Sequence, residues 1–270
     1  MSTLNDQELM PEVSVHLPFK TIHNCRDLAG MKTGDGHTIK PSKLLRSAHL
    51  GRADRHDLLT LENMGISDVI DLRTDWEILL DKDHAIPGAS HHHAEVYTEK
   101  DLSHAQGGQR KLIQSAMTSS RALMENAYRA MIADDGAIAA WKKFFKILLT
   151  AKGGVLFHCT QGKDRTGIAA FLIETALGVE EPQKIDDYMQ TNLYTSKEAA
   201  EDRMAAQEIF RHHLKTADAD IDSYLFAHED YLQAADQEVK KTAGSWKNFL
   251  TEKIGLSQQD LETLRQKYLQ

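Results

Sequence analysis

The stretch from Gly153 to Gly178, GGVLFHCTQGKDRTGIAAFLIETALG, constrains the fold of this 270-residue chain more than any other. Gly153–His158 is a short apolar run typical of a buried strand, and Thr166–Gly178 is an apolar helix that Gly178 closes. A tight loop with a glycine joins them. Since strand, loop and helix in this order form the unit of α/β folds, the stretch indicates that class.

The rest of the chain fits the same class. Hydrophobic spacing predicts a helix over Asp57–Gly65 and a β-branched strand over Ile66–Arg73. The other predicted elements are a strand near His91–Tyr97, a surface loop over Thr98–Lys111, a helical region over Ser119–Leu149 interrupted near Ala133–Gly136, a charged helical region from about Tyr194, and two amphipathic helices in Gly244–Leu269.

The composition limits the partners and the cellular compartment that we expect for this protein. The formal charge of −8 disfavours nucleic acid and anionic lipid as default partners. No apolar run approaches the ~18 residues of a membrane span. The N-terminus does not resemble a signal peptide, and two distant cysteines indicate a reducing compartment. We therefore expect a cytoplasmic protein without stable membrane insertion, although export by another route stays open.

The loop between strand and helix combines an anion-binding shape with a nucleophile. Its backbone N–H groups and the positive end of the following helix favour an anion. The nucleotide pattern GxxxxGK[ST] is missing, because Asp164 follows Lys163. A helix N-terminus and nearby cations stabilise a thiolate at Cys159. The guanidinium of Arg165 can donate two hydrogen bonds to two phosphate oxygens. This pairing indicates covalent phosphoryl transfer to sulfur, and the alternative is a buried structural cysteine near a surface arginine.

At these residues the chain resembles a known family. His158–Gly167, HCTQGKDRTG, is similar to the HCxxGKDRTG signature of the bacterial tyrosine/serine protein phosphatases, a branch of the cysteine-dependent protein tyrosine phosphatases. Other family-like segments are NCRDLAG (24–30), LLRSAHL (44–50), VIDLRTDWE (69–77) and GSWKNFLTEKIGL (244–256). The resemblance implies a central, mostly parallel sheet flanked by helices, with additional C-terminal helices. It implies one phosphatase domain over residues 1–270, with a catalytic core at about 15–193 and a helical part at about 194–270 packed on the core or over the site.

The resemblance also assigns roles residue by residue. It implies that Cys159 is the nucleophile, Arg165 the phosphate-binding arginine, and Thr160, Gln161, Gly162, Lys163 and Asp164 the loop whose amides hold phosphate. His158 would orient the loop, and Thr166 would assist departure of the thiolate. Lys163 matches a lysine shared with lipid phosphatases. Cys25 stands where the family usually has Phe.

The general acid has two candidates. Asp164 lies inside the loop, and the family motif carries an Asp there. Its cationic neighbours Lys163 and Arg165 favour the ionised carboxylate, whereas a bound phosphate dianion would reverse this. The upstream pair Asp134 and Asp135 is the other candidate, although these residues also suit a helix break and N-cap. We favour Asp164.

Several other residues allow two interpretations. The side chains of Arg26, Asp27, Arg46, Asp71 and Arg73 would either brace the phosphate loop or form ordinary buried ion pairs. The run His91–His93 suggests a metal only weakly, because alternate strand residues face opposite sides. Cys25 would either fill part of a Phe-sized space or trap an oxidised Cys159 as a disulfide.

The sequence thus predicts a phosphomonoesterase that needs neither metal nor cofactor and acts on phosphotyrosine, and in part on phosphoserine or phosphothreonine, in proteins. A phosphoinositide phosphatase is the competing enzyme: Lys163 supports it, while the acidic charge and Gln161, where lipid phosphatases favour Lys, oppose it. The partner would be a phosphorylated protein or a phospholipid head group. A phosphate-binding adaptor with a dead site is the alternative of another class, which the intact pair of Cys159 and Arg165 disfavours.

Overall fold

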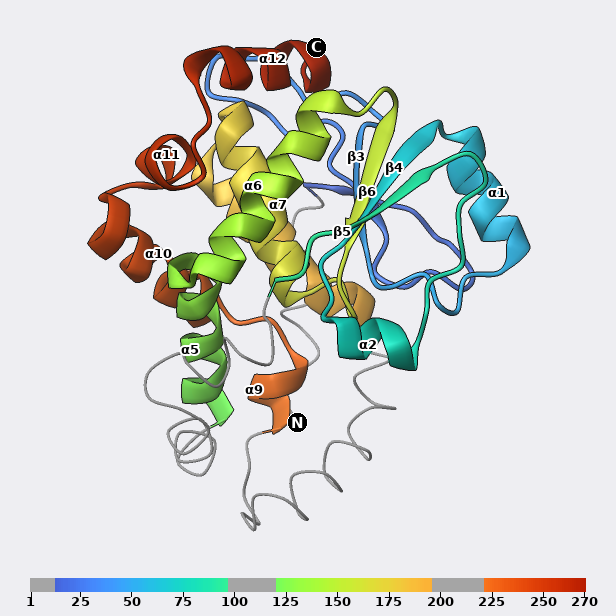
Figure 1. Ribbon diagram of the computed structural model, residues 1–270, viewed down its shortest axis with the longest axis horizontal. Coiled ribbons are helices and arrows are strands. Elements are labelled where there is room, and N and C mark those ends of the chain that lie inside the picture. The colour runs from blue at the N-terminus through green and yellow to red at the C-terminus, as the bar shows by residue number, and fades with distance from the viewer. Residues whose placement is uncertain (1–12, 97–119, 196–220) are drawn as a thin grey trace, which may run out of the picture.

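The computed structural model describes residues 13–96, 120–195 and 221–270 (Figure 1). The predicted loop Thr98–Lys111 and residues 196–220 of the predicted charged helical region lie outside these ranges. Within them, no helix combines the length and the apolar character needed to cross a bilayer.

A six-stranded mixed sheet forms the centre, in the order β1-β2-β3-β6-β4-β5. The strands are β1 (Val15–His16), β2 (Arg26–Asp27), β3 (Leu44–Ser47), β4 (Ile66–Asp71), β5 (Ser90–His93) and β6 (Gly154–His158). Strands β3, β6, β4 and β5 run parallel, whereas β1 and β2 add antiparallel pairs at one edge. The predicted α/β class with a mostly parallel sheet is therefore confirmed.

Helices cover both faces of the sheet (Figure 1). They are α1 (Arg55–Asn63), α2 (Asp75–Leu80), α5 (Ser120–Ala133), α6 (Asp135–Thr150), α7 (Asp164–Leu177), a helix over residues 181–195, α9 (Ile221–Leu225), α10 (Glu229–Ala243), α11 (Trp246–Asn248), a π-helical turn (Phe249–Lys253) and α12 (Gln258–Tyr268). Helix α1 lies on one side of the sheet, and α5, α6 and α7 lie on the other.

The two faces of the sheet divide the core into two clusters. Because side chains alternate along a strand, neighbouring residues enter different clusters. Leu44, Ile70, Val155 and Phe157 pack with α6 and α7, whereas Leu45, Val69 and Leu156 pack with α1. The parallel register places Leu156 between Leu45 and Val69, so the α1 face of the sheet is apolar at its centre. Strand β6 is buried at every residue, as its uninterrupted apolar run predicts.

Local signals set most boundaries correctly. The break predicted near Ala133–Gly136 falls between α5 and α6, and Gly178 ends α7 in the left-handed conformation at φ +85°. Strand β5 ends at His93, earlier than predicted. The amides of Ala94 and Val96 still donate to the carbonyls of Asp71, the last residue of β4, and of Leu72, which follows it. Helix α7 starts two residues earlier than predicted, at Asp164.

The C-terminal helices pack on the same core. Residues of α10 and α12, among them Tyr231 and Leu264, belong to the cluster that contains β6 and α7. The Tyr268 hydroxyl donates to the Leu148 carbonyl at 2.7 Å, and Gln270 and Thr38 exchange backbone hydrogen bonds. The boundary expected near residue 193 lies inside the helix over residues 181–195. Of the two amphipathic helices predicted in Gly244–Leu269, the second is α12, while the first is a short α-turn that continues as the π-helical turn.

Candidate active site

The loop that begins at Cys159 lies at the carboxyl ends of the parallel strands, where α/β folds bind ligands. Cys159 follows β6 and is 3% exposed. Gly162 takes φ +68°, and a Cβ there would lie only 2.4 Å from the carbonyl oxygen of Ser47. The loop therefore requires glycine both for its backbone conformation and for its close approach to β3.

Two side chains hold the carbonyls of this loop. The Asn24 amide donates to the carbonyls of Gln161 at 3.0 Å and of Gly162 at 3.1 Å. Arg46 Nη2 donates to the same Gly162 carbonyl at 3.0 Å. Because carbonyl and N–H point in opposite directions in a peptide unit, holding carbonyls on the outside favours N–H groups that face the inside, as an anion-binding loop needs.

A buried group of charged side chains, Arg26, Arg46 and Asp187, holds Arg46 in position for its contact with the loop. Asp187, in the helix over residues 181–195, bonds to Arg46 and lies 3.4 Å from Arg26. Burial lowers the pKa of Arg26 to about 10, helped by the charge of Arg46. Burial also disfavours the charged form of Asp187, but attraction to both arginines outweighs it and lowers the pKa of this carboxyl. Asp27 makes no such contact: it accepts from the amides of Ala29 and Ser42 and orders the chain before β3.

Arg165 is held by a residue to which the sequence assigned no role. Both Nη atoms of Arg165 donate to the carboxylate of Glu77 in α2, each at 2.6 Å. The Thr160 hydroxyl donates to the same carboxylate. Burial alone would raise the pKa of Glu77, but the hydrogen bonds and charge of Arg165 hold it well below its usual range. A bidentate, charge-assisted pair thus fixes the arginine beside the loop.

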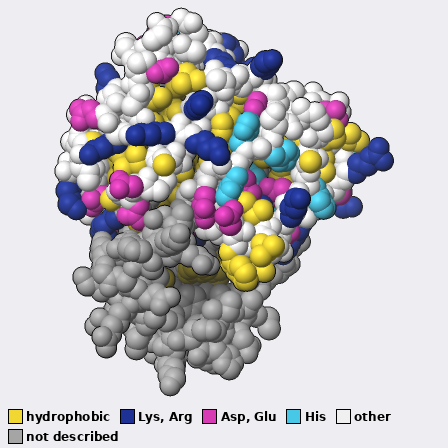
Figure 2. All heavy atoms as spheres, viewed as in Figure 1, with side chains coloured by type: hydrophobic (Ala, Val, Ile, Leu, Met, Phe, Trp, Pro, Cys, Tyr) yellow, Lys and Arg dark blue, Asp and Glu magenta, His cyan; other side chains and the backbone are white. Residues whose placement is uncertain are grey.

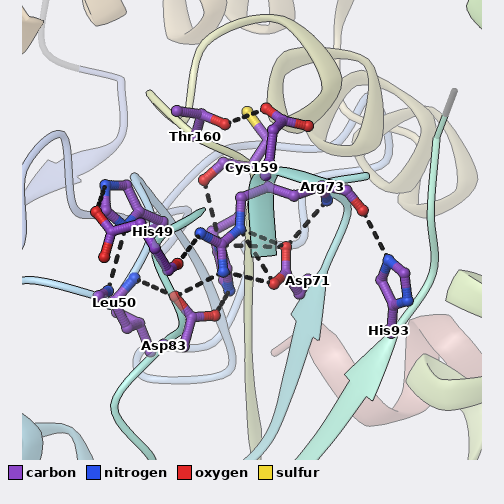
Figure 3. Close-up of polar contacts among 12 residues, drawn as sticks. His49, Leu50, Asp71, Arg73, Asp83, His93, Cys159 and Thr160 are labelled. Carbon is purple, nitrogen blue, oxygen red and sulfur yellow. Dashed lines mark hydrogen bonds and ion pairs between the residues drawn. The ribbon is translucent and has the colours of Figure 1, made fainter. Parts of the chain in front are cut away.

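His158 is buried and faces carboxylates. Its Nε2 lies 3.0 Å from Asp83, and its Nδ1 lies 3.8 Å from Asp71. Burial favours the neutral ring, yet these two carboxylates prevail and raise the pKa of His158. Figure 3 shows Arg73 between Asp71 and Asp83, with the Cys159 sulfur on the Thr160 side of the group.

Among the residues that the structure describes, two groups have the spacing of metal ligands. Asp71, Asp83 and His158 each place one ligand atom within 4.8 Å of the others, but Arg73 pairs with both carboxylates and supplies the positive charge. Asp75, His93 and Glu95 form a second, more exposed group. The three histidines of the run His91–His93 make separate contacts: His91 accepts from the amide of Ile86, His92 contacts Asp68, and His93 contacts the carbonyl of Arg73.

The two acid candidates have different surroundings. Asp164 begins α7 and accepts a hydrogen bond from the hydroxyl of Tyr128 in α5 at 2.7 Å. Asp134 stands at the N-cap position of α6, where its side chain makes no capping hydrogen bond, and the exposed Asp135 is the first residue of that helix. Only Asp164 is covalently part of the loop.

Lys163 and Thr166 complete the loop. The buried ammonium of Lys163 donates to the carbonyl of Tyr224 in α9 at 2.5 Å and lies 3.7 Å from Asp164. The lysine therefore joins the loop to the C-terminal helices. The Thr166 hydroxyl is buried and has no hydrogen-bond partner among the residues that the structure describes.

Exposed apolar side chains lie on the surface near the loop, on helix α2. Figure 2 shows hydrophobic side chains beside acidic ones, in the region where Figure 1 places α2. In that helix Trp76, Leu79 and Leu80 are exposed by 56%, 74% and 68%.

Cys25 is fully buried in the cluster on the α1 side, and Cys159 belongs to the other cluster. Burial raises the pKa of the Cys25 thiol, which favours its interpretation as a small core residue over a redox partner.

Sequence reasoning missed several residues of the site: Asn24, Glu77, Asp83, Tyr128 and Asp187. Asn24 and Glu77 belong to segments that carry the family resemblance, which was a signal for both. The other three lie outside the quoted segments, and only the tertiary structure brings them to the loop.

Comparison with known proteins agrees with this geometry. The model of a tyrosine phosphatase family matches residues 17–270. A Cupriavidus necator protein provisionally named a tyrosine-protein phosphatase is 30% identical over 257 residues, which cover 94% of this chain and 88% of that protein. The Triple specificity protein phosphatase PtpB of Mycobacterium tuberculosis is 29% identical over 90% of this chain and 95% of its own length. The chain therefore belongs to the tyrosine phosphatase family and is a hydrolase of the protein-tyrosine-phosphatase type.

Proposed function

We propose that this hydrolase removes phosphate from phosphotyrosine in proteins through a phosphocysteine intermediate on Cys159, without a metal ion, and that residues 1–270 form one cytoplasmic phosphatase domain. One observation carries the proposal: Cys159 opens a loop whose outward carbonyls are held by Asn24 and Arg46, and Arg165 stands in the first turn of the next helix. Nucleophile, amide donors and guanidinium thus converge on one site.

In the first step, the Cys159 thiolate attacks phosphorus, and the bond from phosphorus to the substrate oxygen breaks. The departing phenolate takes a proton from Asp164, so a neutral phenol leaves. Loop amides and Arg165 bind the three non-bridging oxygens as charge shifts in the transition state. Glu77 fixes the orientation of Arg165 before substrate arrives.

In the second step, water attacks the phosphocysteine while the Asp164 carboxylate accepts one of its protons. The sulfur–phosphorus bond breaks, inorganic phosphate forms, and the thiolate is restored. The Thr166 hydroxyl, buried near the start of α7, can donate to the departing sulfur. The carboxylates that raise the pKa of His158 favour its positively charged form beside the strand end, and that charge would favour the thiolate of Cys159.

A protein substrate is favoured over a phosphoinositide. The lysine that motivates the lipid alternative, Lys163, is 1% exposed and donates to a backbone carbonyl of α9. To contact an inositol phosphate, this buried ammonium would first have to become accessible. The Mycobacterium tuberculosis relative is named a triple specificity phosphatase, so phosphoserine, phosphothreonine and phosphoinositides all remain substrates to be tested beside phosphotyrosine.

Hydrolysis of p-nitrophenyl phosphate in the presence of a chelator tests the proposal. The wild type should turn over, and Cys159→Ser should lose activity while it still binds vanadate or phosphate. Mass spectrometry after rapid acid quenching should find one phosphoryl group on the peptide that contains Cys159. Near-normal turnover by Cys159→Ser would end the proposal. Rates on a phosphotyrosine peptide and on a soluble inositol phosphate separate the two enzyme alternatives, and an inactive wild type would favour the adaptor.

A further inference from the structure

Asp164 is the end of a chain of buried hydroxyl groups. The Tyr128 hydroxyl donates to Asp164 Oδ1 at 2.7 Å, and the Tyr188 hydroxyl lies 2.7 Å from that of Tyr128. The two tyrosines come from α5 and from the helix over residues 181–195, and they are 0% and 1% exposed. Elements far apart in the sequence therefore meet at one oxygen of the proposed general acid.

The rings that carry these hydroxyls are closely packed. The rings of Tyr128 and Tyr188 meet edge to face, with centroids 6.2 Å apart, and the Tyr231 ring of α10 lies 5.4 Å from that of Tyr128. A Cβ on Gly167 would approach the Tyr188 ring to 2.8 Å, so α7 also contacts this ring closely. The hydroxyl positions are thus fixed by packing as well as by hydrogen bonds.

The hydrogen bond from Tyr128 to Asp164 sets the direction of the protons in this chain. Burial raises the pKa of both phenols well above 10, helped by the charge of Asp164, so each keeps its single proton. The proton of Tyr128 goes to the carboxylate, and Tyr188 must therefore donate to Tyr128. Tyr188 also has a hydrogen bond with the backbone of His228, which helps to hold its hydroxyl in place.

We propose that Tyr128 is a positioning residue that keeps Oδ1 of Asp164 as an acceptor, so that Oδ2 carries the proton given to the leaving group. This inference rests on the proposed role of Asp164 as the acid. Because Oδ1 already accepts the Tyr128 proton, Oδ2 is the favoured oxygen for a proton that Asp164 takes up. Lys163 is the cation near Oδ2, at 3.7 Å, and Arg165, next in the chain, directs its charge to Glu77. The ring of His228 packs against the ring of Tyr231, on the side of the aromatic cluster formed by α10.

The test compares Tyr128→Phe with Tyr231→Phe. Both changes remove one buried hydroxyl from the same aromatic cluster, but the Tyr231 hydroxyl donates to the carbonyl of Ser223 and not to the acid. The measurement is kcat for a series of aryl phosphates from p-nitrophenyl to phenyl phosphate. Tyr128→Phe should lower kcat about 10-fold or more on phenyl phosphate and less than about threefold on p-nitrophenyl phosphate, since only a poor leaving group needs the proton. Tyr231→Phe should lower both rates equally.

The pH profile gives a readout that loss of packing would not change. A donor to an ionised carboxylate stabilises the ionised form, so its removal should move the alkaline limb of kcat to higher pH in Tyr128→Phe. Thermal unfolding checks that the variant folds. Tyr188→Phe leaves Asp164 its direct donor but removes the hydrogen bonds of Tyr188 with Tyr128 and with the His228 backbone. It should change both readouts in the same direction by a smaller amount and serves if Tyr128→Phe does not fold.

A double-mutant cycle links the effect to the acid. In the Asp164→Asn background, Tyr128→Phe should cause no further loss on phenyl phosphate. Equal losses in both backgrounds, an unchanged leaving-group dependence, or the same dependence in Tyr231→Phe would overturn the inference while leaving the phosphocysteine mechanism intact. Absence of the phosphocysteine in the wild type would instead reject the proposed function.

Discussion

Replacing Gly162 by alanine tests whether the shape of the phosphate loop is set by its contact with β3. Gly162 has φ +68°, and an added Cβ would lie 2.4 Å from the carbonyl oxygen of Ser47 and 2.7 Å from the amide nitrogen of Ala48. All the nearest atoms belong to backbone, so no side chain can move aside. The change therefore displaces the loop itself.

The magnitude follows from this overlap. Cβ atoms essentially never come closer than 3.0 Å to another heavy atom, so the 2.4 Å contact requires a shift of at least 0.6 Å. The left-handed backbone conformation adds about 1–2 kcal/mol for alanine. Since a misplacement of about 1 Å can reduce a rate about 100-fold, kcat/KM should fall roughly 30- to 100-fold or more.

Gly36→Ala is the matched control. Gly36 has φ +90°, and nothing lies within 4 Å of the position of its Cβ. This variant also places alanine at a positive φ but has no overlap, and it should lose about 1–2 kcal/mol of stability with unchanged kcat/KM. The assays are thermal unfolding and hydrolysis of p-nitrophenyl phosphate for both variants. If Gly162→Ala keeps kcat/KM within about threefold of the wild type, the reasoning is refuted.

Three further changes probe the charged groups. Arg165→Lys keeps the charge but loses the fork, and kcat/KM should fall at least ~100-fold; a change below about threefold would mean that Arg165 does not bind phosphate. Glu77→Gln should leave Arg165 less well oriented and lower kcat/KM about 10-fold, whereas a faster variant would show that the carboxylate competes with substrate. The pKa of His158 is raised by folding, so its contribution to stability is complete below about pH 6.5 and is lost as pH rises through the higher folded pKa. Unfolding free energies measured from pH 6 to 9 should fall with pH in the wild type and less steeply in His158→Asn; equal slopes would contradict this assignment.

The sequence by itself determined the local part of the site. Cys159 and Arg165 are separated by five residues, so one strand end, one loop and one helix turn bring them together whatever else the chain does. Apolar periodicity likewise predicted β6, α7 and the break between α5 and α6. These features depend on interactions between residues close in the sequence, and the spacing of apolar residues predicts such local structure well.

The partners of the loop were decided by the tertiary structure. Glu77 is 88 residues from Arg165, and Asn24 is 138 residues from Gly162. The sequence placed Asp27 beside Arg26 and Arg46 as a possible brace, yet Asp27 bonds to backbone amides before β3, and the carboxylate between the two arginines belongs to Asp187. Such pairings depend on strand order and on the packing of helices over the sheet.

The physical reason is that many weak contacts decide which distant residues meet. The register of β3 beside β6 places Ser47 next to His158, and the same register brings Arg46 to the loop. Packing of α5 on α10 and α7 places the Tyr128 hydroxyl against Asp164. Neither tyrosine nor aspartate carries a local signal for this contact, because its free energy comes from the burial of whole helix faces and from the hydrogen bond that this burial then requires.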